Sequence, residues 1–335
     1  MDYVTLGSTG IVSNKNGFGA LPIQRLSKDD AVYLLKKAFD NGITFYDSAR
    51  FYTDSEEKIG EALSGVRDKI VIATKTPESD VDVFWKNLET SLRNMKTDYI
   101  DVYQFHNPTF CPKPGDDSGL YDAMLEAKAQ GKIRHIGLTN HRLDVAREAA
   151  ESGLYEVLQY PLSYLAAQDE LELISLCKER NIGVLAMKAL AGGLLTNSAA
   201  AYAFLMQFDN VLPIWGVQRE SELDEFIAYQ SAPPVLNDEL RRVIEDDVAQ
   251  LGGDFCRGCG YCMPCPVGIE INTVSRMSLL LRRAPLSIWF SDRWKDNMKL
   301  ITECKDCGKC KKHCPYGLDI PRLLRDNWED FQTFL

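Results

Sequence analysis

The sequence predicts a (β/α)8 barrel, an α/β fold, followed by a smaller helical domain that contains most of the cysteines. Eight short apolar runs recur along the chain, and segments with helical spacing separate them. The expected strands are residues 17–22, 43–47, 69–74, 99–105, 133–138, 156–160, 183–188 and 211–217. Eight strands that alternate with helices over about 220 residues fit a closed barrel, which usually takes about 250.

A doubly wound open sheet is the alternative architecture for this alternation. Such a sheet favours a Gly-x-Gly-x-x-Gly turn after its first strand, and the sequence has none there. Residues 1–15 alternate in polarity around Gly-Ser-Thr-Gly, which predicts a hairpin before the barrel. Helical spacing is clear at 29–42, 82–95 and 143–153, and glycine ends the first and last of these segments.

The C-terminal part of the sequence contains an internal repeat. CPVGIEI at 265–271 matches CPYGLDI at 314–320, and three cysteines precede each copy. Residues 272–303 have helical spacing, and Pro321 stands at a suitable first position for a final helix. The expected domains are the barrel at 1–235, a linking helix at 236–253 that ends in Gly252 and Gly253, and the cysteine-rich domain at 254–335.

Eight of the ten cysteines form two runs with metal-ligand spacing. The second run is Cys304-x2-Cys307-x2-Cys310-x3-Cys314-Pro, the spacing of bacterial ferredoxins, in which the fourth cysteine ligates the neighbouring cluster. The first run consists of Cys256, Cys259, Cys262 and Cys265. Its last gap is one residue shorter than in the ferredoxin pattern, so the spacing leaves open which of the two clusters Cys265 ligates. The sequence predicts two 4Fe–4S clusters in a helical, ferredoxin-like domain.

Zinc is the alternative ligand for cysteine pairs. A zinc site needs only two such pairs, and two runs of four, each ending in Cys-Pro, exceed that need. Disulfides are not expected, because tight runs of this kind in a large intracellular chain are typical of metal binding. Cys111 and Cys177 lie outside the runs, and Cys177 is predicted to be a buried helix residue.

Charge and hydropathy exclude some classes of partner. The formal net charge of −10 argues against a nucleic-acid partner. No signal peptide is evident, and no apolar run approaches the roughly 20 residues of a membrane helix, so we expect a cytoplasmic protein with no membrane contact. Residues 254–335 nevertheless hold 13 Lys and Arg against 10 Asp and Glu, which would suit anionic clusters.

Four polar residues stand at or just after the ends of three consecutive expected strands. They are Asp47, Tyr52, Lys75 and His106. Side chains at the C-terminal ends of barrel strands are where barrel enzymes place their catalytic groups. The pKa of a tyrosine, near 10, is too high for efficient acid catalysis at neutral pH, and a buried ammonium beside it lowers that pKa. A carboxylate would hold the ammonium in place, and the histidine would orient a carbonyl oxygen.

With these four residues in this order along the sequence, the chain resembles the aldo/keto reductase family. The segment YDSARFYTDSEEKIGEAL is similar to the family's second-strand signature, and the resemblance covers about residues 1–235. It implies that Tyr52 is the general acid, that Lys75 and Asp47 tune it, and that His106 orients the carbonyl. It also implies that NAD(P)H supplies hydride. The whole chain resembles the subgroup of the family that carries C-terminal ferredoxin-type clusters.

The resemblance also implies residues that bind the cofactor. Thr139, Asn140 and Gln159 match positions that bind the nicotinamide amide. Barrel phosphate sites follow the seventh and eighth strands. Here those segments contain Gly192, Gly193 and Leu194, and then Val217 to Ser221. Ser221 is expected to cap the helix that follows the eighth strand.

The sequence departs from the family pattern at three cofactor positions. Met187 replaces an aromatic residue at the ring-stacking position, and Gly216 replaces a lysine. Glu222 stands where an arginine usually clamps the 2′-phosphate of NADP, with Arg219 nearby as a substitute. A carboxylate repels a phosphate, so the choice between NAD and NADP stays open.

The main prediction is an NAD(P)H-dependent oxidoreductase that interconverts a small carbonyl compound and an alcohol and carries two 4Fe–4S clusters for electron transfer or redox coupling. The alternative is an electron-transfer or redox-sensing iron–sulfur protein, in which the barrel is a scaffold for a flavin or a partner. A redox partner protein fits either prediction. The intact set of four barrel residues favours the enzyme.

Overall fold

The computed structural model describes residues 2–77, 80–251, 255–283 and 289–335. The chain divides into two compact units. The first contains the residues up to Ala189 together with Ala199–Asp238, and the second contains Leu190–Ser198 together with Glu239–Leu335.

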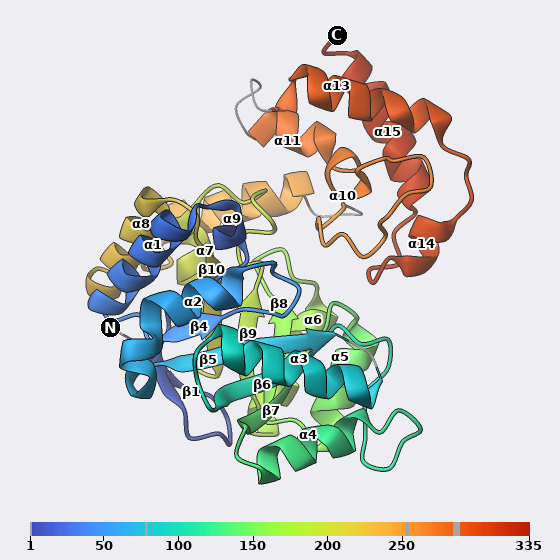
Figure 1. Cartoon of the computed structure of the whole chain (residues 1–335). Coiled ribbons are helices and arrows are strands. Elements are labelled where there is room, and N and C mark those ends of the chain that lie inside the picture. The colour runs from blue at the N-terminus through green and yellow to red at the C-terminus, as the bar shows by residue number, and fades with distance from the viewer. Residues whose placement is uncertain (1, 78–79, 252–254, 284–288) are drawn as a thin grey trace. The chain divides into compact units, whose positions relative to one another are not determined.

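The first unit is a closed barrel of eight parallel strands (Figure 1). The strands are β3 (Gly17–Gly19), β4 (Phe45–Asp47), β5 (Val71–Pro77), β6 (Ile100–His106), β7 (Ile133–Thr139), β8 (Val157–Pro161), β9 (Gly183–Met187) and β10 (Val211–Gly216). They follow one another around the barrel in sequence order, and β10 pairs with β3 to close it. All eight overlap the expected strands, so the predicted fold class is confirmed.

Helices follow the strands and cover the barrel. They are α1 (Lys28–Asp40), α2 (Ser55–Leu63), α3 (Val81–Asn94), α4 (Leu120–Ala129), α5 (Leu143–Ser152), α6 (Gln168–Glu179), α7 (Ser198–Leu205) and α8 (Glu220–Ser231), with short 3-10 turns η1 (Pro22–Arg25) and η2 (Ser64–Lys69). Ser27 and Asp80 cap α1 and α3 by accepting N–H groups of the first turn. Gly153 ends α5 with a φ of 71°, as the sequence predicts.

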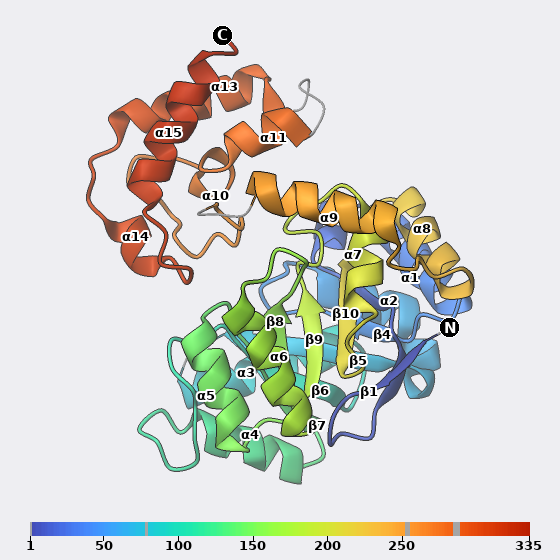
Figure 2. The same cartoon turned by 180° about the vertical axis from the view of Figure 1, so that it is seen from behind.

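The predicted hairpin closes one end of the barrel. It consists of β1 (Tyr3–Thr5) and β2 (Val12–Asn14), which pair antiparallel (Figure 2). Val4 and Leu6 are buried in one apolar cluster with residues from the beginnings of the barrel strands, such as Phe45 and Val102. The hairpin therefore covers the N-terminal end of the barrel, and the strands' C-terminal ends remain for chemistry.

The second unit is helical. Its helices are α9 (Asp238–Leu251), α10 (Ile271–Val274), α11 (Met277–Arg283), α13 (Asp292–Lys299), α14 (Lys309–His313) and α15 (Ile320–Gln332), with η3 (Leu300–Glu303). No strand occurs in 255–283 or 289–335, which confirms the helical prediction. The expected linking helix corresponds to α9, whereas Gly252 and Gly253 lie outside the described residues. Pro321 is the second residue of α15 rather than the first, because the cap is Asp319.

The long helix α15 organises the C-terminal part of this unit. It packs against α10, α11 and α13. Its buried Asn327 donates to the carbonyl of Ser275 at 3.1 Å and accepts from the N–H of Ser278 at 2.9 Å. These bonds fix the turn between α10 and α11.

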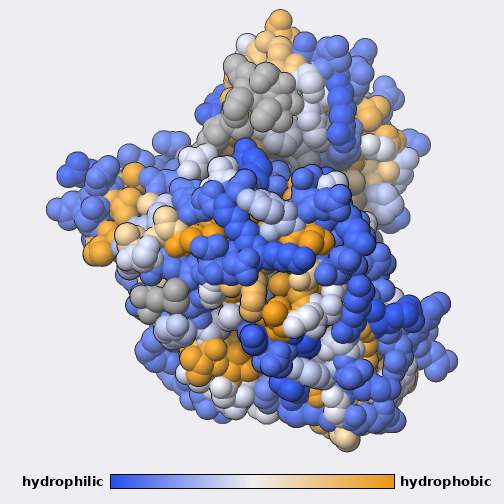
Figure 3. Space-filling view, turned by 60° about the vertical axis from the view of Figure 1, so that its left-hand side comes forward, coloured by the Kyte–Doolittle hydropathy of each residue, from blue (hydrophilic) through white to orange (hydrophobic). Residues whose placement is uncertain are grey.

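Polar and charged residues cover most of the face seen in Figure 3, and apolar side chains form separate patches on it. Within the described ranges, no helix is both long and apolar enough to cross a membrane.

Candidate active site and cysteine clusters

A buried ion pair between Lys75 and Asp47 forms the centre of the candidate active site. Asp47 is the last residue of β4, and Lys75 lies in the neighbouring strand β5, two residues before its end. The Lys75 ammonium donates to both Asp47 carboxylate oxygens, at 2.8 and 2.7 Å, and to the carbonyl of Ser48 at 2.5 Å. Burial lowers the pKa of Lys75, and the Asp47 carboxylate opposes this shift. The barrel thus holds an ammonium out of contact with water.

Tyr52 and His106 lie beside this ion pair. Tyr52 stands in the turn between β4 and α2, and the Lys75 ammonium is 5.2 Å from the centre of its ring. His106 ends β6, and its ring meets the Tyr52 ring edge to face with centroids 5.9 Å apart. Burial, and then the Lys75 charge, lower the pKa of His106 to about 3. The imidazole is therefore neutral at physiological pH, and within the described residues its buried Nδ1 has no hydrogen-bond partner.

Two buried glutamines extend the network across the barrel interior. Gln159 of β8 donates to Asp47 at 3.3 Å, and Gln104 of β6 donates to the side-chain oxygen of Gln159 at 2.9 Å. The sequence predicts that Gln159 binds the cofactor, whereas Gln104 is not among the predicted site residues. Side chains alternate between the two faces of a strand, so Gln104, two residues before His106, shares its face of β6. This alternation is the sequence signal that points to Gln104.

The other residues predicted to bind the nicotinamide also stand at strand ends. Thr139 ends β7 and Met187 ends β9, and the Thr139 hydroxyl donates to the Met187 sulfur at 3.9 Å. The buried side chain of Asn140 donates to the carbonyl of Pro108 at 2.9 Å and accepts from the N–H of Arg142 at 2.8 Å. These bonds fix the orientation of the Asn140 amide.

The N-terminus of α8 differs from the prediction. Gly216 ends β10 and is exposed, and Val217 is buried. The cap of α8 is Arg219, so Ser221 lies inside the helix and does not cap it. The Glu222 carboxylate instead accepts the N–H groups of Gln218 and Arg219, which precede the helix, both at 3.0 Å. The same carboxylate pairs with the Arg219 guanidinium at 2.6 Å.

Gly192, Gly193 and Leu194 belong to the second unit. Gly192 and Gly193 have φ angles of 68° and 89°, which favour glycine, and the Gly193 N–H bonds to the carbonyl of Leu190 at 2.8 Å. Leu194 is buried.

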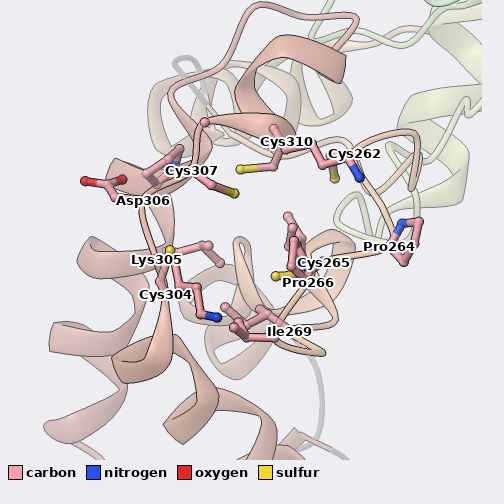
Figure 4. Close-up of a pocket in the computed structure, with 16 residues that line it drawn as sticks. Cys262, Pro264, Cys265, Pro266, Ile269, Cys304, Lys305, Asp306, Cys307 and Cys310 are labelled. Carbon is pink, nitrogen blue, oxygen red and sulfur yellow. The ribbon is translucent and has the colours of Figure 1, made fainter.

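One group of cysteines surrounds a cavity in the second unit (Figure 4). Cys304, Cys307 and Cys310 line it from the second run, and Cys262 and Cys265 line it from the first. Apolar residues such as Pro266 and Ile269 complete the wall. The last cysteine of the first run therefore lies across the cavity from three cysteines of the second.

A second group consists of Cys256, Cys259, Cys262 and Cys314; Cys262 also lines the cavity, and three of the four are buried. Burial, and then the thiols of Cys256, Cys259 and Cys314, raise the pKa of Cys262 to about 12. Cys314, the last cysteine of the second run, therefore lies near Cys262 of the first run. Cys256, Cys262 and Cys314 are buried, whereas Cys307 is exposed. Outside both groups, Cys177 is buried in α6, as predicted.

The two groups supply the thiol ligands that an iron–sulfur cluster takes. Among the described residues, no three His, Cys, Asp or Glu side chains gather closely enough to hold one metal ion. Thiols that surround a cavity suit a bulky iron–sulfur core. Arg276 adds a second observation: in the part of the chain that the structure describes, its buried Nε and Nη1 have no partner, and its charge lies near Cys256 and Cys259. A buried cation of this kind calls for an anion beside it.

Comparison with known proteins gives two family matches. The aldo/keto reductase family matches residues 15–200, and the 4Fe-4S dicluster domain matches residues 255–319. The L-galactose dehydrogenase of Arabidopsis thaliana is 30% identical over 213 residues, which cover 57% of this chain and 66% of that enzyme. The aldo-keto reductase YhdN of Bacillus subtilis is 29% identical over 220 residues, which cover 58% and 64%. The chain thus spans slightly less than two thirds of these relatives.

Solved structures share the barrel. An aldo-keto reductase from Klebsiella pneumoniae in complex with NADPH has a TM-score of 0.62 and 22% identity, over 73% of this chain and 95% of that one. At this identity the likeness concerns the fold.

Proposed function

Because the chain belongs to the aldo/keto reductase family, we propose that its barrel interconverts a small carbonyl compound and an alcohol with NAD(P)H, and that its second unit holds two 4Fe–4S clusters. The observation that carries the enzymatic proposal is the buried Lys75–Asp47 pair beside Tyr52 and His106, at the C-terminal ends of three neighbouring strands.

In the proposed reaction Tyr52 gives its phenolic proton to the carbonyl oxygen as that oxygen gains charge. The Lys75 ammonium stabilises the phenolate that remains, because it lies 5.2 Å from the ring centre and is shielded from water. Asp47 keeps the ammonium charged and fixed in position. A bound nicotinamide would supply or accept the hydride at the carbonyl carbon.

His106 would orient the substrate rather than donate the proton. Its pKa of about 3 keeps the ring neutral at physiological pH, so it carries no proton that it readily gives up. A neutral imidazole has one N–H, which would bind the carbonyl oxygen beside Tyr52.

The nicotinamide amide would bind at Thr139, Asn140 and Gln159. The side chains of Asn140 and Gln159 are already held by hydrogen bonds, which supports a preorganised site. Met187 would pack against the ring. Phosphates would bind the segment Val217 to Ser221, which follows the last barrel strand.

We further propose that NADH binds at least as well as NADPH. The Glu222 carboxylate accepts the N–H groups of Gln218 and Arg219, just before α8, and neutralises Arg219, which is the nearest substitute for a phosphate clamp. Gly216 adds no charge. A 2′-phosphate there would meet a carboxylate and no free cation from these residues.

Each proposed cluster takes three ligands from one run and one from the other. We propose that Cys256, Cys259, Cys262 and Cys314 hold an inner cluster, and that Cys304, Cys307, Cys310 and Cys265 hold an outer cluster; the electrostatic proximity of Cys314 to Cys262 and the cavity shared by the outer ligands support this division. This exchange follows the ferredoxin pattern. The shortened gap before Cys265 is compatible with it.

A hydride carries two electrons, whereas a 4Fe–4S cluster takes up one at a time, so carbonyl reduction in the barrel needs no electron from the clusters. One-electron transfer to a partner is the second function that we propose for the chain. The exposed Cys307 favours it, because an exposed ligand brings its cluster to the surface.

The test is direct. Anaerobically purified protein is mixed with NADH or NADPH and 4-nitrobenzaldehyde, a reactive aldehyde probe, and both cofactor oxidation and alcohol formation are followed. Equal amounts of oxidised cofactor and alcohol are expected. No alcohol with either cofactor from protein that holds its iron would contradict the enzymatic proposal.

A further inference from the structure

We propose that the surface around the outer cluster docks an acidic protein that carries one electron. The proposal rests on the proposed clusters and identifies where they exchange electrons. The outer ligands are the accessible ones: Cys307 is exposed, and none of Cys265, Cys304 and Cys310 is fully buried. The inner group has three buried ligands. Because electron transfer weakens steeply with distance, the outer cluster is the one that a partner can reach.

The segment that holds the outer cluster is basic. Lys305, Lys309, Lys311 and Lys312 are all exposed and stand between Cys304 and Cys314, with Asp306 as the only acidic residue among them. Lys305 and Lys309 line the cluster cavity. The docking surface is defined here by Lys305, Lys309 and Lys312.

The charges of these three lysines are available to a partner. Lys311 forms an ion pair with Asp319 at 2.9 Å, and the negative charge of Asp306 is offset by Arg325 at 3.5 Å. Among the described residues, no ion pair or side-chain hydrogen bond involves Lys305, Lys309 or Lys312. The whole chain carries −10, so this surface stands out against an acidic background. Charge complementarity therefore indicates an acidic partner, and its attraction would speed the encounter.

The test measures electron transfer to two probe proteins. Holo-protein with both clusters is reduced with dithionite, freed of excess reductant, and mixed in a stopped-flow instrument with oxidised plastocyanin, which is acidic, or horse cytochrome c, which is basic. In each reaction one electron leaves a reduced cluster and reduces one copper or haem iron. With plastocyanin, the second-order rate constant should fall as ionic strength rises.

The Lys305→Gln, Lys309→Gln, Lys312→Gln triple variant should lower the plastocyanin rate constant about tenfold or more at low ionic strength. The matched control is Lys36→Gln, Lys69→Gln, Lys86→Gln, which removes the same charge from exposed positions of the barrel and should change the rate less than twofold. Equal effects of the two triple variants, or a plastocyanin rate that does not depend on salt, would overturn the docking proposal alone. Iron analysis that finds no outer cluster would overturn the proposed function as well.

An independent observation carries a second proposal. We infer that Arg276 donates hydrogen bonds to sulfurs of the inner cluster and raises its reduction potential. The guanidinium charge lies near Cys256 and Cys259, and its Nε and Nη1 are buried with no partner in the described part of the chain. Reduction adds negative charge to a cluster, so a cation with free N–H groups beside it favours the reduced form.

The surroundings of Arg276 hold it ready for this role. Gly258 has a φ of 65°, and a Cβ there would lie 2.9 Å from the guanidinium carbon, so only glycine leaves room for the close approach. Asn327 fixes the turn that contains Arg276 through its bonds to Ser275 and Ser278.

The measurement is a potentiometric titration of both clusters, monitored by electron paramagnetic resonance. Arg276→Gln should disfavour reduction of one cluster by about tenfold, equivalent to about 59 mV for one electron, and leave the other unchanged. Arg276→Lys, which keeps the charge, should shift the same cluster by less. The control Arg282→Gln removes a half-exposed arginine that pairs with Asp330 and should shift neither. If the Arg276→Gln protein retains only four irons, it has lost one cluster, and the potentials of the Arg276→Lys protein then test the proposal. Two unchanged potentials, or equal shifts of both, would overturn the proposal.

Discussion

Replacing Lys75 by methionine separates the structural and chemical roles of the buried ion pair. The methionine fills a similar volume but removes three hydrogen bonds, two of them to Asp47. The Asp47 carboxylate then stays buried and loses its counter-charge, and among the described residues its one remaining side-chain bond comes from Gln159 at 3.3 Å. Breaking a buried pair in this way costs about 3–5 kcal/mol of stability. We therefore expect Lys75→Met to be clearly less stable than the unchanged protein.

The double variant Lys75→Met, Asp47→Asn removes the uncompensated charge and leaves an acceptor for Gln159. It should recover most of the lost stability. Catalysis should not recover, because both variants lack the ammonium that stabilises the Tyr52 phenolate. The rate of aldehyde reduction should fall by the 10²–10⁴ typical of general acid catalysis in both.

Urea unfolding of anaerobic samples, followed by circular dichroism, gives the free energy of unfolding, and cofactor oxidation with 4-nitrobenzaldehyde gives kcat. In the double variant the free energy of unfolding should therefore recover, whereas kcat should stay low. If the double variant regained both, Lys75 would act on the reaction only through folding, and the assigned role in acid catalysis would be refuted.

Three further predictions follow from the same geometry. Anaerobic protein should hold about eight irons, and Cys265→Ser and Cys314→Ser should each disrupt a different cluster; stoichiometric zinc with little iron would count against both ligand sets. Glu222→Arg should raise the preference for NADPH over NADH at least tenfold in kcat/KM, whereas Glu225→Arg, which makes the same charge change at an exposed position further along α8, should leave it unchanged; a strong NADPH preference before mutation would show that Glu222 does not control this choice. The folded-state pKa of His106, about 3, lies below its unfolded value, so the unfolded chain binds a proton between these values and stability falls as pH falls through that window. Between pH 7 and 5, the free energy of unfolding measured with urea should therefore fall by on the order of 1–2 kcal/mol more in the unchanged protein than in His106→Gln. Equal decreases in the two proteins would contradict a buried neutral imidazole.

The strands and the four central residues of the barrel site could be predicted because their signals are local. Apolar runs mark buried parallel strands, and a polar residue at the end of such a run, as at Asp47 and His106, stands out in the sequence. Strand order then brings these residues to one rim.

The rest depends on contacts between residues far apart in sequence. Gln104 looks like an ordinary strand residue until Gln159 is found beside it, 55 positions away. Ser221 has a side chain that is suited to capping, but Arg219 occupies the cap position of α8. The Arg219 N–H donates to the Glu222 carboxylate. The unpartnered guanidinium of Arg276 depends on the approach of Gly258, which no spacing rule predicts.

In the proposed reaction Tyr52 donates the proton to the carbonyl oxygen. Tyr52→Phe removes one hydroxyl oxygen and keeps the ring that meets His106 edge to face, so the site should keep its shape. With unchanged iron content and unchanged cofactor affinity, measured by fluorescence titration, kcat for 4-nitrobenzaldehyde should fall by about 10²–10⁴. A variant that binds cofactor normally and keeps more than half of its kcat would contradict the account.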